Sequence, residues 1–280
     1  MFCDIALAER IERAEADLVT RASQSAQRRS AGASGAATTG FVTPLAGGVA
    51  SFAEEDSPFN KVAGLGFGGV PAAAELDEIE RAFAARGAPV QVELAHLADP
   101  EIGVALTRRG YRLESFENVL GMPLGGVPRP LQPPGIEIRP SGEEELGPWL
   151  DVVVDASAHP DTQGIPWLEE FPREALAWAE QDLMAAGAQR YSALHDGVLA
   201  GGAGLRLAGG IAQLTGAATA PAHRRRGIQS ALLAARLADA AAAGCDVAVV
   251  ITQPGSKSQQ NVQRQGFDLL YTRAVLVKHP

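Results

Sequence analysis

The sequence has few cysteines, no excess of positive charge and no long apolar run. Its two cysteines, Cys3 and Cys245, lie at opposite ends of the 280 residues, so they form neither a disulfide framework nor a metal-binding pair by spacing. The formal net charge of -9 argues against a general nucleic-acid-binding surface, which needs a basic face. No apolar run approaches the roughly 18 residues that cross a bilayer, and charges interrupt the N-terminal segment, which excludes a secretory signal. We therefore expect a cytoplasmic protein with no metal site and no nucleic-acid or membrane partner.

The composition is sufficient for a substantial core and the length for two domains. Hydrophobic residues make up 46% of the chain, and 31 glycines with only 5% aromatic residues favour closely packed helices and tight turns. Residues 30–40 are small and without period, which predicts a mobile segment. Four prolines between Pro128 and Pro134 exclude a helix or an inner strand there. We expect domains at 1–130 and 136–280.

The two halves carry a similar pattern of helix, strand, short helix and strand. In the first half the pattern lies around Gly87 and Gly110, and in the second around Gly244 and Gly266. The spacing of the two glycines is similar in each half, and an aromatic residue follows Gly110 and Gly266. This indicates an internal duplication. The alternative is two ordinary α/β units that share a common turn glycine.

The most informative segment is a basic loop between a predicted strand and a predicted helix. The strand ends near Thr219, the loop contains three consecutive arginines and Gly227, and an alanine- and leucine-rich helix begins near Ser230. Such a loop directs backbone N–H groups and the positive end of a helix dipole at one place, where arginines add charged donors. The segment therefore predicts a phosphate or pyrophosphate site. It is neither a Gly-x-Gly-x-x-Gly nor a P-loop motif.

This segment resembles the acyl-CoA motif of the GCN5-related N-acetyltransferase (GNAT) superfamily. Residues Pro221 to Gln229 fit Pro-x-x-(Arg/Gln)-x-x-Gly-x-(Gly/Ala), except that Gln229 replaces the last Gly/Ala. The order of elements predicted over 136–280 is also that of the family. The first half lacks the basic glycine loop and resembles a degenerate, non-catalytic copy. The resemblance implies an α/β (α+β) GNAT fold, a mixed and mostly antiparallel twisted sheet flanked by helices, in tandem with a partial GNAT-like domain.

The resemblance implies transfer of an acetyl group from acetyl-CoA to a primary amine of a small molecule, by direct transfer in a ternary complex. Many relatives use a tyrosine four residues before the conserved glycine as the acid, but Val262 stands at that position. Tyr271 and Ser258 are the remaining candidates for the acid, and His159, Asp161 or Glu169 for the base. The residues expected to bind CoA are Ala217, Ala218, Thr219, Arg224, Arg225, Arg226, Gly227, Ile228, Gln229, Ser230 and Asn261.

Two alternatives to an enzyme remain open at the level of the sequence. The missing tyrosine and the degenerate first half also suit a non-catalytic acyl-CoA-binding sensor or regulatory module. Nucleic-acid binding through the three arginines is disfavoured by the acidic total and by the absence of interleaved aromatic residues. The first domain has three roles open to it: a lid, a pseudo-dimer partner, or the contact surface of a homodimer.

Overall fold

Residues 1–34, 40–126, 133–159 and 171–280 are described by the structure, a computed structural model. The chain divides into two compact units. The N-terminal unit consists of Phe2–Val119 and Leu269–Pro280, and the C-terminal unit consists of Leu120–Asp268 with Met1. This division differs from the one drawn at residues 130 and 136, because the last strand of the chain lies in the N-terminal unit.

The N-terminal unit contains three helices among its described residues, and its strands are ordered β1-β2-β3-β4-β11-β5. The pairs β1–β2, β2–β3 and β4–β11 are antiparallel, and β3–β4 is parallel. Strand β5 contributes its first part to this unit and its last part to the other. The elements are α1 (Ile5–Ser34), β1 (Phe41–Leu45), β2 (Gly48–Phe52), β3 (Lys61–Ala63), α2 (Ala73–Ala84), β4 (Val90–Ala95), α3 (Pro100–Arg108), β5 (Arg112–Pro123) and β11 (Asp268–Lys278).

Helix α1 extends further than the sequence pattern predicts. The segment 30–40 was expected to be mobile, but residues 30–34 are the last residues of α1. Arg29 and Ser30 both donate hydrogen bonds to the carboxylate of Glu54, with distances of 3.2 and 3.1 Å to Oε2. These contacts join the helix to Glu54 at residues 29 and 30. The mobility of residues 30–34 stays a prediction, although the structure assigns them to α1. Residues 35–39 lie outside the described part of the chain.

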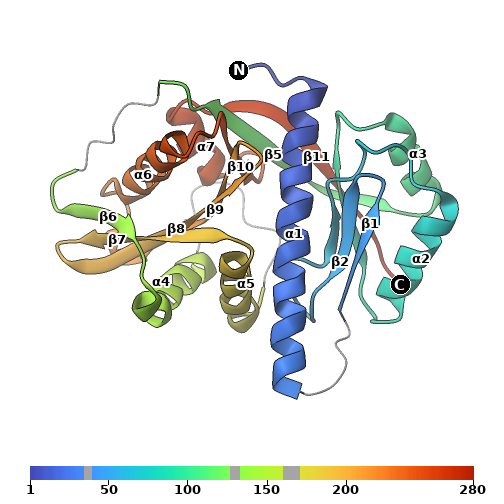
Figure 1. Cartoon of the computed structure of the whole chain (residues 1–280), viewed down its shortest axis with the longest axis horizontal. Coiled ribbons are helices and arrows are strands. Elements are labelled where there is room, and N and C mark those ends of the chain that lie inside the picture. Colours follow the sequence, from blue (N-terminus) through green and yellow to red (C-terminus); the bar gives the residue numbers. More distant parts are fainter. Residues whose placement is uncertain (35–39, 127–132, 160–170) are drawn as a thin grey trace. The chain divides into compact units, whose positions relative to one another are not determined.

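The two faces of the N-terminal sheet are covered by different helices. The hydroxyls of Ser23 on α1 and Ser51 on β2 are buried and lie 2.5 Å apart. The neighbours of Ser51 in the strand, Ala50 and Phe52, belong instead to the apolar cluster that includes Phe83 of α2. Because successive strand residues point to opposite faces, α1 and α2 lie on opposite sides of β2 (Figure 1).

The C-terminal unit has the strand order β5-β10-β9-β8-β7-β6. The pairs β6–β7, β7–β8 and β8–β9 are antiparallel and β9–β10 is parallel. The prediction of a mixed, mostly antiparallel sheet flanked by helices is confirmed. Its elements are β6 (Ile136–Pro140), η1 (Glu143–Glu145), α4 (Leu146–Ala158), α5 (Arg173–Ala185), β7 (Ala188–His195), β8 (Val198–Ala208), β9 (Ile211–Thr219), η2 (Pro221–His223), α6 (Ile228–Ala242), β10 (Val247–Thr252) and α7 (Lys257–Arg264).

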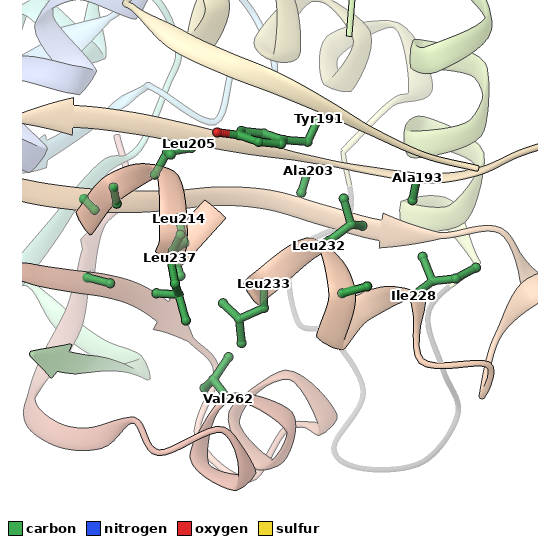
Figure 2. Packing of buried hydrophobic residues seen from close by; sticks show 14 of the residues in the cluster. Tyr191, Ala193, Ala203, Leu205, Leu214, Ile228, Leu232, Leu233, Leu237 and Val262 are labelled. Carbon is green, nitrogen blue, oxygen red and sulfur yellow. The ribbon is translucent and has the colours of Figure 1, made fainter. Parts of the chain in front are cut away.

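Helix α6 forms the main core of this unit against the sheet. Leu232 and Leu237 of the helix pack with Leu205 and Leu214 of β8 and β9, and all four side chains are buried (Figure 2). Helices α4 and α5 cover the other face of the sheet (Figure 1). Burying a leucine side chain contributes about 1.5–3 kcal/mol. The start of α6 is therefore held firmly in relation to the end of β9.

The glycines that suggested a duplication close their helices with the same hydrogen bonds in both halves. Ala88 N–H donates to the carbonyl of Phe83, and Cys245 N–H donates to that of Ala240, each five residues back. In the same way, Tyr111 N–H donates to the carbonyl of Leu106, and Phe267 N–H donates to that of Val262. The glycines themselves have φ between +66° and +95°. The local geometry is thus repeated, but many helices end in this way, so the duplication stays a prediction.

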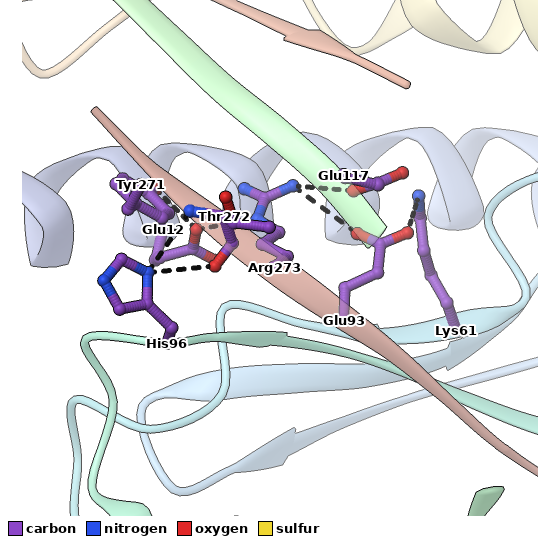
Figure 3. Close-up of polar contacts among 8 residues, drawn as sticks. All are labelled: Glu12, Lys61, Glu93, His96, Glu117, Tyr271, Thr272 and Arg273. Carbon is purple, nitrogen blue, oxygen red and sulfur yellow. Dashed lines mark hydrogen bonds and ion pairs between the residues drawn. The ribbon is translucent and has the colours of Figure 1, made fainter. Parts of the chain in front are cut away.

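The last strand is held in the N-terminal unit by buried charges (Figure 3). Arg273 of β11 donates from Nε to Oε1 of Glu12 on α1 at 2.8 Å, and its Nη1 lies 3.6 Å from Glu93 and 3.5 Å from Glu117. Burial alone would lower the pKa of Arg273, but the surrounding charges, first that of Glu12, raise it well above its usual range. Lys61 donates to Glu93 at 2.7 Å. Two cations thus join α1 and four strands.

We expect Arg273→Met to lower the free energy of unfolding by about 3–5 kcal/mol, because it leaves buried carboxylates without their cation. Urea unfolding followed by circular dichroism measures this. The matched control is Arg21→Met on α1, whose partner Asp17 is also exposed, and whose loss should cost less than about 1 kcal/mol. A loss below 1 kcal/mol for Arg273→Met would show that the buried cluster does not hold the strand.

Candidate functional site

Strand β9 contains one residue more than the strand opposite it. Ala217 pairs with Ala203 and Thr215 pairs with Gly204, so Gly216 has no partner in the register between β8 and β9. This is a β-bulge, which bends a strand and changes the direction of its side chains. Gly216 and Ala217 are exposed. The predicted CoA-binding residues Ala217, Ala218 and Thr219 follow the bulge directly.

Strands β9 and β10 part at the same level. Their parallel register runs from Ile211–Val247 to Gln213–Val249 and ends there, although both strands continue. From Leu214 to Thr219, β9 therefore has no register with β10 within the described residues. Backbone N–H and C=O groups on this edge remain available to a ligand lying along the strand.

The loop from β9 to α6 has a backbone suited to an anion. Gly227 precedes the first residue of α6 with φ +88°, and Arg225 has φ +62°, an uncommon value for a residue with a side chain. Gly227 has no side chain to cap the helix, so the first N–H groups of α6 point outward at the positive end of the helix dipole. Arg225 and Arg226 are exposed beside them. These residues fit a pyrophosphate.

Arg224 has a different role from its two neighbours. Its guanidinium donates to the carbonyl of Thr219 at 3.3 Å, to that of Ala156 at 3.3 Å, and to that of His159. It thus connects the loop to the C-terminal end of α4. The predicted phosphate contact by Arg224 stays a prediction, but the structure shows that Arg224 stabilises the loop. Gln229, the departure from the family motif, accepts a hydrogen bond from Thr219 Oγ1 at 3.4 Å.

Helix α7 carries three residues named from the sequence. Ser258 is exposed and Asn261 is half-buried. Val262, at the position of the family's tyrosine, is buried in the core with α6 (Figure 2). The end of α7 meets the start of α6, where Gln265 Nε2 donates to Ser230 Oγ at 3.4 Å. The structure therefore places α7 beside the anion site and gives Val262 a packing role.

The remaining catalytic candidates are placed differently from one another. His159 ends α4 with an exposed ring whose Nδ1 lies 2.8 Å from the carbonyl of Asp155, and its own carbonyl accepts from Arg224. Tyr271 belongs to the N-terminal unit and is buried, and its hydroxyl donates to Glu12 at 2.6 Å. Burial and the charge of Glu12 raise the pKa of Tyr271 far above its usual range. Asp161 and Glu169 lie outside the described residues.

Two charged residues that the sequence reasoning missed lie at the bulge. Arg236 of α6 is buried and donates from Nη1 to the carbonyls of Gly204 and Thr215, at 2.9 and 3.3 Å. Burial lowers the pKa of Arg236 to about 10. Glu180 of α5 reaches Gly216, and burial raises the pKa of Glu180 to about 7. The signal for Glu180 was its helical spacing from Leu176 and Leu183 on a half-buried face.

Two absences limit the kinds of site that the described part of the chain can hold. None of its helices combines the length and apolar character that crossing a membrane requires. Across the same residues, histidine, cysteine and acidic side chains form no group of three or more that could hold a metal ion.

Comparisons with known proteins agree with this geometry. Residues 154–267 match the model of the acetyltransferase (GNAT) family. A GCN5-related N-acetyltransferase from Kribbella flavida shares the fold with a TM-score of 0.62 and 22% identity, over 92% of this chain and 95% of its own. A tandem GNAT protein from the clavulanic acid biosynthesis pathway has a TM-score of 0.60 and 12% identity, over 88% and 80%. No curated protein matches the sequence. Residues 154–267 therefore match the model of the acetyltransferase (GNAT) family, and the chain shares its fold with a GCN5-related N-acetyltransferase and with a tandem GNAT protein.

Proposed function

We propose that the C-terminal unit binds acetyl-CoA and transfers the acetyl group directly to a primary amine of a small molecule. The observation that carries this proposal is the coincidence of three features at one end of β9. The strand bulges at Gly216, it parts from β10 after Gln213, and it leads into a helix whose N-terminus is preceded by Gly227. A long ligand with a pyrophosphate at one end and an acyl group at the other suits this arrangement.

The donor is held by charge at one end and by backbone at the other. The first N–H groups of α6, with Arg225 and Arg226, bind the pyrophosphate. The open edge of β9, from Gly216 to Thr219, hydrogen-bonds the pantetheine and the thioester. Asn261 and Ser230 lie on the two helices that meet beside the loop and supply further polar contacts.

Transfer requires an attack by a neutral amine on the thioester carbonyl. The carbonyl oxygen gains negative charge as the new N–C bond forms, and a backbone N–H fixed in place by the sheet stabilises that charge without reorganising. One such donor contributes about 100-fold in kcat in well-studied acyl transfers. Holding both substrates side by side on one scaffold supplies a further part of the rate.

A second candidate function is a non-catalytic acyl-CoA-binding module. It is favoured by two placements, Val262 in the core and the Tyr271 hydroxyl engaged with Glu12, which leave Ser258 as the remaining named acid. Release of free thiol from acetyl-CoA across a panel of primary amines separates the two functions. Turnover that depends on the amine excludes a pure binding module.

We further propose that the N-terminal unit is a degenerate copy that binds no CoA. Its loop from β3 to α2 takes the same place in the order of elements as the basic loop from β9 to α6 in the other unit. Helix α2 begins after Ala72, whose N–H donates to Glu75 Oε2 at 2.7 Å, so a carboxylate already occupies the N-terminal end of the helix. A second anion at this place would be repelled, and the loop offers no arginine.

We expect acetyl-CoA at about 100 times its Kd to stabilise the protein by about 2.7 kcal/mol, or roughly 5–10 °C in Tm. Gly227→Asp should abolish this shift, because it places a carboxylate at the pyrophosphate and a side chain at a left-handed φ. Gly69→Asp is the matched control, an exposed glycine with φ +93° in the corresponding loop of the other unit. The absence of any shift at millimolar acetyl-CoA would contradict the proposal.

Isothermal titration should give one acetyl-CoA per chain, since only the C-terminal unit presents an uncapped helix and arginines to the pyrophosphate. The same stoichiometry is expected for Gly69→Asp, whereas Gly227→Asp should show no binding. Two equivalents bound per chain, with one persisting in Gly227→Asp, would show that the N-terminal unit is not degenerate.

A further inference from the structure

Glu180 of α5 comes close to the backbone at the bulge of β9. If Gly216 carried a Cβ atom, that atom would lie 2.7 Å from Oε1 of Glu180 and 3.6 Å from its carboxyl carbon. A real Cβ atom is not found 2.7 Å from an oxygen, so the carboxylate of Glu180 would have to move if residue 216 carried a side chain. In the observed conformation the acidic group therefore lies against Gly216, on the part of β9 that has separated from β10.

The carboxylate of Glu180 has no counterion among the described residues. Within this part of the chain, it makes neither a hydrogen bond nor an ion pair with another side chain. The charged groups of the neighbouring elements are engaged elsewhere. Asp151 and Asp155 of α4 face Arg173, and Arg190 of β7 donates to a backbone carbonyl at 3.0 Å. A half-buried carboxylate without a cation is costly to the folded state, which makes it unusual outside a binding site.

Burial changes the pKa of the Glu180 carboxyl group. It raises the pKa of Glu180 to about 7, and no neighbouring charge opposes that effect. Near neutral pH the side chain therefore exists in both forms and can accept and return a proton. A carboxyl with an ordinary pKa would be a much weaker base.

We propose that Glu180 binds the ammonium group of a cationic primary amine beside Gly216 and takes the proton that the amine must lose before it attacks. This inference rests on the proposed acetyl transfer and names its acceptor class and its base. The position supports both roles, because Gly216 lies on the edge of β9 that has separated from β10 and that presents the thioester in the proposed function.

The step balances as follows. The ammonium gives one proton to the Glu180 carboxylate, and the resulting amine attacks the thioester carbonyl carbon. The N–C bond forms and the C–S bond breaks. The electron pair of the broken bond stays on the CoA sulfur, which takes the second proton of the attacking nitrogen. Glu180 returns its proton to the solvent, so the products are the acetamide, CoA thiol and one proton.

The acceptor class follows from the same environment. Since no cation of the described residues is paired with Glu180, a positively charged ligand supplies a partner and gains a charge-assisted hydrogen bond. A neutral or anionic acceptor would gain nothing from the carboxylate, and an anion would be repelled. Cationic primary amines such as di- and polyamines or amino-acid amides are therefore the expected acceptors.

The test compares Glu180→Gln, which keeps the shape but removes the base, with Glu174→Gln, an exposed glutamate in the first turn of the same helix. Thiol release from acetyl-CoA is measured with putrescine, spermidine and lysine amide from pH 5.5 to 9. For the wild type, kcat/KM should rise about tenfold per pH unit below pH 7 and level off above it, as Glu180 of the free enzyme becomes ionised. Glu180→Gln should lose at least about 100-fold in kcat, and its kcat/KM should lose the inflection near pH 7. Glu174→Gln should match the wild type.

The thermal shift with acetyl-CoA, measured on every variant, separates the outcomes. Glu180→Gln should keep the full shift, which shows that it folds and binds the donor. If Glu180→Gln keeps kcat within about threefold and retains the inflection, the assignment is wrong. If acetyl-CoA stabilises the wild type but no amine of the panel accelerates thiol release, the acceptor inference is also wrong, while donor binding stands. The absence of a shift for the wild type would overturn the proposed function itself.

Discussion

The C-terminal unit depends on one extra residue in β9. A bulge at Gly216 shifts the register against β8, and β9 parts from β10 three residues earlier, after Gln213. The bulge is held from the α6 side, where the buried Arg236 donates to the carbonyls of Gly204 and Thr215 on either strand. Because the lowered pKa of about 10 still leaves Arg236 charged near neutral pH, these bonds are charge-assisted. The candidate site is built on this fixed irregularity of the sheet.

The two units show how one arrangement of elements can hold different chemistry. Both use the same order of helix, strand, helix and strand, and both close their helices with the same backbone hydrogen bonds. They differ at the helix that follows the parallel strand. In the N-terminal unit Glu75 satisfies the start of α2, whereas in the C-terminal unit Gly227 leaves the start of α6 open beside Arg225 and Arg226. The side chains at a helix terminus therefore distinguish the units more clearly than their folds do.

The sequence was a good guide to what is local and a poor guide to what is brought together by folding. The order of elements from β6 to α7 is the one that the resemblance to the GNAT superfamily implied, and the basic loop followed from contiguous residues at Arg224 to Gly227. The position of the last strand could not be predicted in this way, because it depends on a hydrogen bond between Arg273 and Glu12, which are 261 positions apart. The position of Glu180 was not predicted for the same reason. Glu180 lies beside a bulge in β9, and a bulge depends on the register between two strands, which the sequence of one segment does not show. The helical assignment of residues 30–34 did not follow from the sequence, because these residues are small and have no period.

A raised carboxyl pKa does not by itself mark a site in this protein. Burial, together with the nearby charge of Glu93, also raises the pKa of Glu117 in the N-terminal unit to about 7, the same value as for Glu180. Glu117 nevertheless lies 3.5 Å from Arg273, inside a cluster whose carboxylates have their own cations, so its energy is balanced within the fold. Glu180 has no such cation among the described residues. A half-buried carboxylate with no cation among the described residues, at a bulge next to an open sheet edge, would be stabilised by a cation from outside. The distinction between the two glutamates thus comes from their partners, and it is the missing partner of Glu180 that directs attention to a cationic substrate.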